Sequence, residues 1–124
     1  MAVSIDVLRS LLHQSWGRET SGQWLPGNPA RGQCNVTSLV VNDLLGGEIL
    51  KTAAPGGWHF YNRIDGTRHD LTASQFDEPI AYADVASDRD DAFAGITVSQ
   101  YLILKDRVEA LLGVDTTPTK LRQR

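Results

Sequence analysis

The sequence contains a single cysteine, Cys34, and His59 and Asp70 follow it along the chain. These are the residue types of a thiol nucleophile, the general base that serves it, and the carboxylate that orients the base. One cysteine cannot form a disulfide within the chain, so another role has to account for it. Cys34 comes where a loop is predicted to give way to a helix, and a helix N-terminus stabilises a thiolate through roughly half a positive charge and unpaired N–H groups.

Acyl transfer at such a thiol also requires hydrogen-bond donors for the oxyanion. The backbone N–H of Cys34, at the start of the helix, is one candidate. The side-chain amides of Gln23 and Gln33 are the others: Gln23 lies in a long loop and could fold back over the thiol, whereas Gln33 adjoins it. The sequence leaves the choice between these two glutamines open.

A predicted β-hairpin determines how His59 and Asp70 lie relative to each other. Asp65-Gly66 is a strong signal for a two-residue turn between strands predicted over residues 58–64 and 67–72. In this register, His59 and Asp70 are diagonal neighbours on one face of the sheet, about 7–8 Å apart at the backbone. The other hairpin histidine, His69, points to the opposite face, so the register selects His59 as the partner of Asp70.

The elements that must position these residues indicate an α+β fold. Apolar spacing and stop signals predict three main helices packed on an antiparallel sheet of at least three strands, with the Cys34 helix against the sheet. Residues 17–33 contain four glycines and two prolines, which predicts a long irregular segment of the kind that is often functional. Residues 74–84 are predicted to form a loop with a short helical turn, and residues 88–91 an exposed acidic stretch. The predicted helices span residues 4–16, 34–45 and 99–112, and the predicted strands 48–52, 58–64 and 67–72.

Length and composition predict one globular domain over residues 1–115 and a polar, frayed tail over residues 116–124. A net charge of −3 argues against non-specific binding of nucleic acid. No apolar run approaches the roughly 20 residues of a membrane helix, and the N-terminus lacks the pattern of a signal peptide. A lone cysteine fits a reducing compartment, so a cytoplasmic location is expected, with no cofactor and with an unidentified small molecule or peptide as substrate.

Each candidate residue also has a structural interpretation. Cys34 can be a small buried residue, His59 a core histidine with its hydrogen bonds satisfied, and Asp70 a brace for the hairpin. A metal site built from these three residues lacks paired-ligand spacing such as C-x-x-C. Two further alternatives are a non-catalytic binding module, which would use the tryptophans and the loop at 17–33, and a redox-sensing thiol.

Several separated blocks, residues 32–37, 43–50, 59–62 and 70–76, resemble the YunG-like family of small bacterial proteins. The resemblance covers about residues 10–112 and implies a common fold without implying an activity. At the level of fold, the same segment is similar to the minimal core of papain-like and transglutaminase-like enzymes, which use the order cysteine, histidine, aspartate. That similarity implies a small cysteine-dependent hydrolase or acyltransferase acting on an amide or thioester, with Cys34 as nucleophile, His59 as base and Asp70 as orienter.

Overall fold

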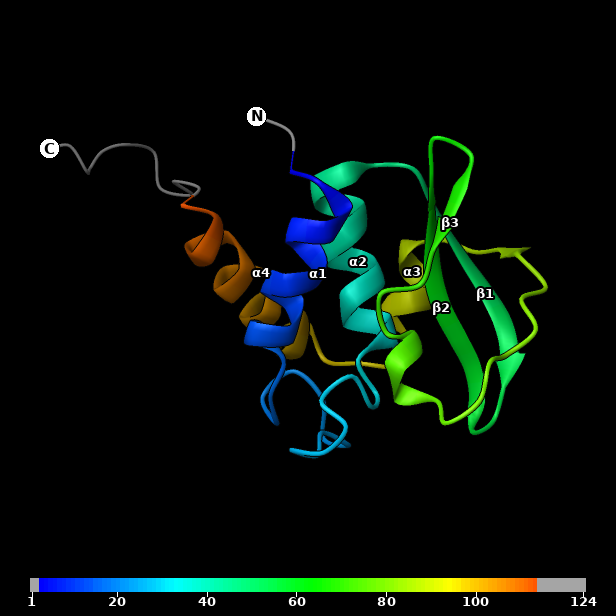
Figure 1. Ribbon diagram of the computed structural model, residues 1–124, viewed down its shortest axis with the longest axis horizontal. Coiled ribbons are helices and arrows are strands. Elements are labelled where there is room, and N and C mark those ends of the chain that lie inside the picture. The colour runs from blue at the N-terminus through cyan, green and yellow to red at the C-terminus, as the bar shows by residue number, and fades with distance from the viewer. Residues whose placement is uncertain (1–2, 114–124) are drawn as a thin grey trace, which may run out of the picture.

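The computed structural model describes residues 3–113 as an α+β fold in which helices pack on an antiparallel sheet. Figure 1 shows the helices gathered beside the sheet, with α2 between the sheet and the other long helices. The helices are α1 (Ile5–Ser15), α2 (Cys34–Leu45), the 3-10 helix η1 (Ala73–Gln75), α3 (Arg89–Phe93) and α4 (Val98–Leu112). The strands are β1 (Glu48–Ala54), β2 (Gly57–Ile64), β3 (Thr67–His69) and β4 (Val85–Ala86).

Helix α2 is the centre of the core, because seven of its twelve residues are buried. Helices α1 and α4 cover it on the side away from the sheet, and the side chains that pack there include Leu8, Leu12 and Leu104, all fully buried. Helix α1 is capped at its start, where the Ser4 hydroxyl accepts a hydrogen bond from the N–H of Val7. Burial on two sides holds α2, and therefore its first residue Cys34, in a fixed position.

The sheet has the strand order β3-β2-β1-β4, with neighbouring strands antiparallel. The β2–β3 hairpin has the predicted register, in which Asn62 pairs with His69 and Ile64 with Thr67. Its turn residues Asp65 and Gly66 have φ of 50° and 81°, the positive values that a two-residue hairpin turn of this type requires. The sequence signal at Asp65-Gly66 therefore determined the register correctly.

Strand β3 is shorter than predicted, because it ends at His69 and Asp70 lies beyond it. The Asp70 side chain explains the early end: its Oδ1 accepts hydrogen bonds from the N–H of Thr72 at 3.2 Å and from the Thr72 hydroxyl at 3.3 Å. An aspartate that bonds the backbone two residues ahead turns the chain. The turn leads into η1, the short helical turn expected in this region.

The acidic stretch at residues 88–91 is also more ordered than predicted. Asp88 caps α3 by accepting a hydrogen bond from the N–H of Asp91, and Asp91 in turn pairs with Lys51 of β1 at 2.7 Å. Ala92 of the same helix is fully buried. Beside it, β4 adds a fourth strand next to β1.

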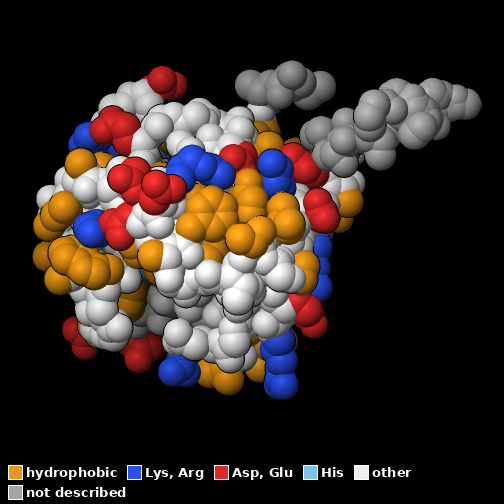
Figure 2. Space-filling model, turned by 180° about the vertical axis from the view of Figure 1, so that it is seen from behind, with side chains coloured by type: hydrophobic (Ala, Val, Ile, Leu, Met, Phe, Trp, Pro, Cys, Tyr) orange, Lys and Arg blue, Asp and Glu red, His pale blue; other side chains and the backbone are white. Residues whose placement is uncertain are grey.

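The predicted polar tail at residues 116–124 lies outside the described residues, which contain no helix long and apolar enough to cross a bilayer. The face seen from behind in Figure 2 carries apolar side chains near its middle, with basic and acidic side chains interspersed around them. That face therefore presents no large area of one charge.

Candidate active site

The loop before α2 is held by the side chain of Gln33, which is fully buried. Its Oε1 accepts a hydrogen bond from the Thr20 hydroxyl at 2.8 Å, and its Nε2 donates to the carbonyl of Gly17 at 3.3 Å. Both ends of the amide are thus occupied in the irregular segment at residues 17–33. The sequence made Gln33 an oxyanion candidate, and the structure gives its amide partners inside the loop instead.

Gly32 lets this loop fold tightly against itself just before the thiol. Its φ is +74°, a conformation that favours glycine, and a Cβ at this position would lie 2.9 Å from the Cβ of Gln23. Gln23 therefore does fold back toward the segment that precedes Cys34. Its side chain is exposed and makes no hydrogen bond among the described residues.

His59 and Asp70 are in direct contact, as the hairpin register predicted. His59 Nε2 lies 2.7 Å from Asp70 Oδ2, and the two side chains are only 3% and 5% exposed. His59 lies beyond the last β2–β3 pair, where β2 is no longer covered by β3 and the turn carrying Asp70 can reach it. The same Oδ2 accepts a hydrogen bond from the hydroxyl of Tyr82 at 2.7 Å.

His59 is electrostatically tuned by its neighbours. Burial alone would lower its pKa, but hydrogen bonds and charge interactions with Asp70 and Cys34 outweigh burial and raise the pKa to about 9. At neutral pH the ring is therefore protonated on both nitrogens and carries a positive charge. Because Nε2 is held by Asp70, Nδ1 is the nitrogen left for Cys34.

Cys34 is the first residue of α2 and is 8% exposed. The first N–H groups of a helix have no partner within it, so the Cys34 N–H is free to bind an anion. The thiol also contacts the adjacent side chain, with Sγ 3.3 Å from Asn35 Oδ1. Asn35 is itself fixed by a 2.8 Å hydrogen bond from its Nδ2 to the carbonyl of Ala92. The thiol is therefore held next to the amide of Asn35, and it is close enough to His59 to help raise the pKa of the imidazole.

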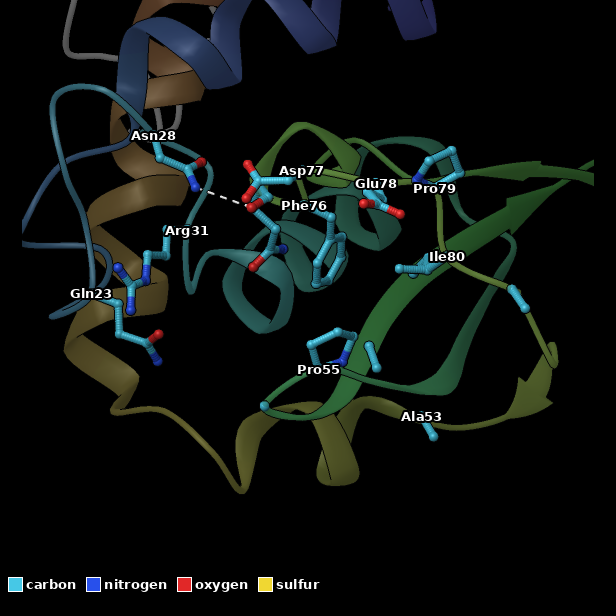
Figure 3. A pocket seen from close by; sticks show the side chains of 14 residues that line it. Gln23, Asn28, Arg31, Ala53, Pro55, Phe76, Asp77, Glu78, Pro79 and Ile80 are labelled. Carbon is cyan, nitrogen blue, oxygen red and sulfur yellow. Dashed lines mark hydrogen bonds between the residues drawn. The ribbon is translucent and has the colours of Figure 1, made fainter.

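A groove of about 830 Å³ lies beside this cluster. Phe76 lines it and also packs edge-on against the His59 ring, with the ring centroids 4.8 Å apart. Figure 3 shows Gln23 and Arg31 together on one wall, with Phe76, Pro55 and Ile80 across from them. The groove thus lies between the loop at residues 17–33, the turn after β1 and the segment after β3. His59, Cys34 and Asp70 do not line it, and Phe76 is its link to the histidine ring.

A second carboxylate, Asp84, lies close to the first. It accepts a hydrogen bond from the Tyr61 hydroxyl at 2.9 Å and forms a two-pronged ion pair with Arg68, at 2.8 and 2.6 Å. Arg68 and, to a smaller extent, Tyr61 lower the pKa of Asp84 to about 2. The Tyr61 and Tyr82 rings touch edge-on at 4.9 Å, so the two carboxylate clusters are neighbours.

Sequence reasoning identified Cys34, His59 and Asp70, which the structure brings together, but it missed their supports. The sequence did not identify three supporting residues, Tyr82, Asn35 and Gln75, because no local pattern predicts the contacts through which they reach the site. A hydroxyl or amide near a sequence motif carries no periodic signal. Only the turn-forming Asp70 could have suggested that the chain bends back here.

Within residues 3–113, no group of three or more histidine, cysteine, aspartate and glutamate side chains has an arrangement that could hold a metal ion.

Comparison with known proteins places the chain in a family. A model of the YunG protein family matches residues 4–113. The protein named "Uncharacterized protein YunG" of Bacillus subtilis strain 168 is 42% identical over 102 residues, which cover 82% of this chain and 89% of that protein. The chain belongs to the YunG family. No solved structure shows significant similarity.

Proposed function

We propose that this protein is a cysteine-dependent hydrolase or acyltransferase that acts on an amide or thioester carbonyl. The observation that carries the proposal is His59, which is buried in contact with Asp70 and has a pKa that Asp70 and Cys34 raise to about 9. A histidine held by a carboxylate on one side and a thiol on the other is the arrangement that nucleophilic catalysis requires. The cysteine–histidine–aspartate order is the one used by papain-like and transglutaminase-like enzymes.

In the first half-reaction, the Cys34 thiolate attacks the carbonyl carbon and the carbonyl π electrons move onto oxygen. The oxyanion is bound by the Cys34 N–H at the start of α2. When the tetrahedral intermediate collapses, the bond to the leaving group breaks, and the His59 imidazolium gives its proton to that group. A thioester at Cys34 and a neutral His59 remain.

In the second half-reaction, neutral His59 takes a proton from water or from an acceptor amine or alcohol, which attacks the thioester. Collapse expels the Cys34 thiolate, and the histidine again carries the proton. Asp70 stabilises the imidazolium in both halves, and Tyr82 holds Asp70 in place through its hydroxyl. The groove beside His59 is the place for the acyl group or the leaving group.

Turnover of activated esters and thioesters tests this proposal. We expect the wild-type protein to release p-nitrophenol from p-nitrophenyl acetate with a burst, and Cys34→Ala to show only the uncatalysed rate. His69→Gln is the matched control, because His69 lies on the same hairpin without a hydrogen bond to Asp70. Equal release by the wild type and Cys34→Ala would rule out the thiol as nucleophile.

A binding module is the second candidate function, and one exposed aromatic residue favours it. Trp58 is 55% exposed, and Lys51 Nζ lies 4.5 Å from the centroid of its ring. Trp16 does not contribute to such a surface, since it is buried and donates a hydrogen bond to Thr37. On this alternative, Cys34→Ser keeps the cellular phenotype and Trp58→Ala loses it.

A redox-sensing thiol is the third possibility, since a thiolate beside an imidazolium can be oxidised to a sulfenic acid. Peroxide would then convert Cys34 to the sulfenic acid, which dimedone traps, without any turnover of ester or thioester. Burst kinetics on the ester combined with resistance to dimedone would exclude it.

A further inference from the structure

The Gln75 amide has a buried nitrogen without a hydrogen-bond partner among the described residues. Buried polar atoms of this kind are rare, because each one loses its hydrogen bonds to water and gains nothing in return. Such an atom calls for a specific explanation, and a ligand that completes its hydrogen bond is one. The other atom of this kind in the described chain is Trp24 Nε1, which lies in the loop at residues 17–33.

Gln75 and its neighbour Phe76 tie this segment to the loop of the nucleophile and to the base. On one side, its Oε1 accepts a hydrogen bond from the N–H of Gly32, two residues before Cys34, at 3.4 Å. On the other side, the next residue, Phe76, packs against the ring of His59. The backbone is held as well, because the Gln75 carbonyl accepts a hydrogen bond from Asn28 Nδ2 at 3.0 Å.

The Gly32 contact also orients the amide. An N–H can bond only to the oxygen of a carboxamide, so Gly32 fixes Oε1 toward the loop and leaves Nε2 with its two hydrogens for another acceptor. Gln75 lines the groove together with Phe76, and its Nε2 is buried within that lining. A donor pair there has no acceptor until a substrate oxygen arrives.

We propose that Gln75 Nε2 and the backbone N–H of Cys34 together form an oxyanion hole, so that the site takes substrates with a planar carbonyl group. The inference rests on the acyl transfer proposed above and assigns its second donor. In the tetrahedral intermediate, the former carbonyl oxygen accepts a hydrogen bond from each of the two N–H groups, and no proton is transferred to it. A purely redox thiol would have no use for this pair of donors.

The two glutamines that the sequence suggested fit the role less well. The Gln33 amide uses its oxygen on Thr20 and its nitrogen on Gly17. Gln23 is exposed to solvent, where water competes for its hydrogens and weakens any stabilisation of charge. Gln75 alone combines a fixed oxygen, a buried nitrogen and contacts to the segments of both Cys34 and His59.

Two reactions of Cys34 separate an oxyanion donor from a residue that only supports the fold. Alkylation by iodoacetamide is a displacement at a saturated carbon and forms no oxyanion, whereas acylation by p-nitrophenyl acetate forms one. We expect Gln75→Glu, which keeps the acceptor for Gly32 but removes the donor, to lower the ratio of acylation to alkylation rate about 10²-fold. Gln75→Met removes both groups at similar size and should lower the ratio by a similar factor, and Gln14→Ala, on the exposed side of α1, should leave it unchanged.

The outcomes distinguish the donor assignment from the proposed function. If wild-type Cys34 acylates and both Gln75 variants keep the wild-type ratio, Gln75 is not the donor and the acyl transfer stands. If Gln75 variants lose alkylation and acylation equally, the residue is structural and the assignment is wrong. If wild-type Cys34 is alkylated but never acylated, the proposed function fails and the assignment fails with it. The melting temperature of each variant shows that the protein compared is folded, and either Gln75 variant alone suffices for the comparison.

Discussion

Two carboxylates that follow β3, Asp70 and Asp84, have similar partners and very different surroundings. Each accepts a hydrogen bond from a tyrosine hydroxyl, and each pairs with a basic side chain, His59 for Asp70 and Arg68 for Asp84. The Asp70 pair is almost closed to solvent, whereas the Arg68 and Asp84 side chains are 40% and 30% exposed. Burial and the choice of base separate the two clusters.

The difference indicates which cluster can do chemistry. The arginine is always protonated, so its pair with Asp84 is a fixed charge pair that braces the segment after β3. The histidine can give and take a proton, and it also adjoins the Cys34 thiol. The Asp84 cluster therefore stabilises the fold, and the Asp70 cluster adds a group that can change its charge.

The largest expected effect comes from removing the base while keeping a partner for Asp70. His59→Gln retains an N–H donor toward the carboxylate but cannot carry a positive charge beside the thiol. We expect the rate of iodoacetamide alkylation of Cys34 at pH 6 to fall roughly 10–100-fold, because the positive charge of His59, which favours the reactive form of the sulfur, is lost. Arg68→Gln, the matching change in the other cluster, should leave the rate unchanged. Equal rates in wild type and His59→Gln would contradict the coupling of His59 to Cys34.

The next effect is on stability and contrasts the carboxylates directly. Asp70→Ala leaves a buried histidine without its partner, so we expect the free energy of unfolding to fall by about 3–5 kcal/mol. Asp84→Ala leaves a solvent-accessible arginine that water can satisfy, and we expect a much smaller loss. Urea denaturation measures both. Similar losses for the two variants would show that burial does not distinguish the clusters.

The third prediction uses pH, which acts on the clusters in opposite directions. The pKa of His59 is raised from about 6.5 to about 9, so its contribution to stability is complete below pH 6.5 and disappears as the pH rises through 9. The loss is on the order of 3 kcal/mol. The pKa of Asp84 is lowered to about 2, so its contribution is present above pH 4 and disappears as the pH falls through 2.

Urea denaturation between pH 6 and 9.5 tests the alkaline half of this prediction. His59→Gln should remove most of the pH dependence in that range, while Asp84→Asn should remove dependence only below pH 4. An alkaline decline that persists undiminished in His59→Gln would assign it to another group.

The smallest effect concerns the tyrosines. Tyr82→Phe removes the hydroxyl that bonds Asp70 Oδ2, which should cost about 1 kcal/mol of stability and should also lower the alkylation rate of Cys34, because Asp70 is less firmly held. Tyr61→Phe removes the corresponding bond to Asp84 and should affect stability alone. If Tyr61→Phe changed the alkylation rate of Cys34 as much as Tyr82→Phe, the reactivity of the thiol would not depend on the Asp70 cluster alone.

Local sequence signals were sufficient for the hairpin and for the two ends of α2. The Asp65-Gly66 turn has one favourable register, and that register brought His59 to Asp70 while leaving His69 without a bond to it. Cys34 and Gly46 were recognised as the limits of α2 because a loop with glycine and proline precedes the helix and a glycine pair ends it. These features depend on residues close together in the chain.

The parts that were missed depend on contacts between distant segments. Helix α3 has a single turn and one fully buried residue, Ala92, so no apolar period marks it in an acidic stretch. Tyr82 meets Asp70 only because the chain turns at Asp70 and returns past β2. The structural role of Gln33, which the sequence offered as an oxyanion donor, was missed for the same reason. Its buried partners Thr20 and Gly17 belong to a loop without periodicity.

The central claim is that Cys34 and His59 form one electrostatic unit, and an NMR titration of the His59 ring tests it most directly. Our account predicts a pKa of about 9 for His59 in the wild-type protein and a clearly lower pKa in Cys34→Ala, because one of the groups that raise it is gone. A His59 ring that titrates near 6.5, with the same pKa in Cys34→Ala, would contradict the account.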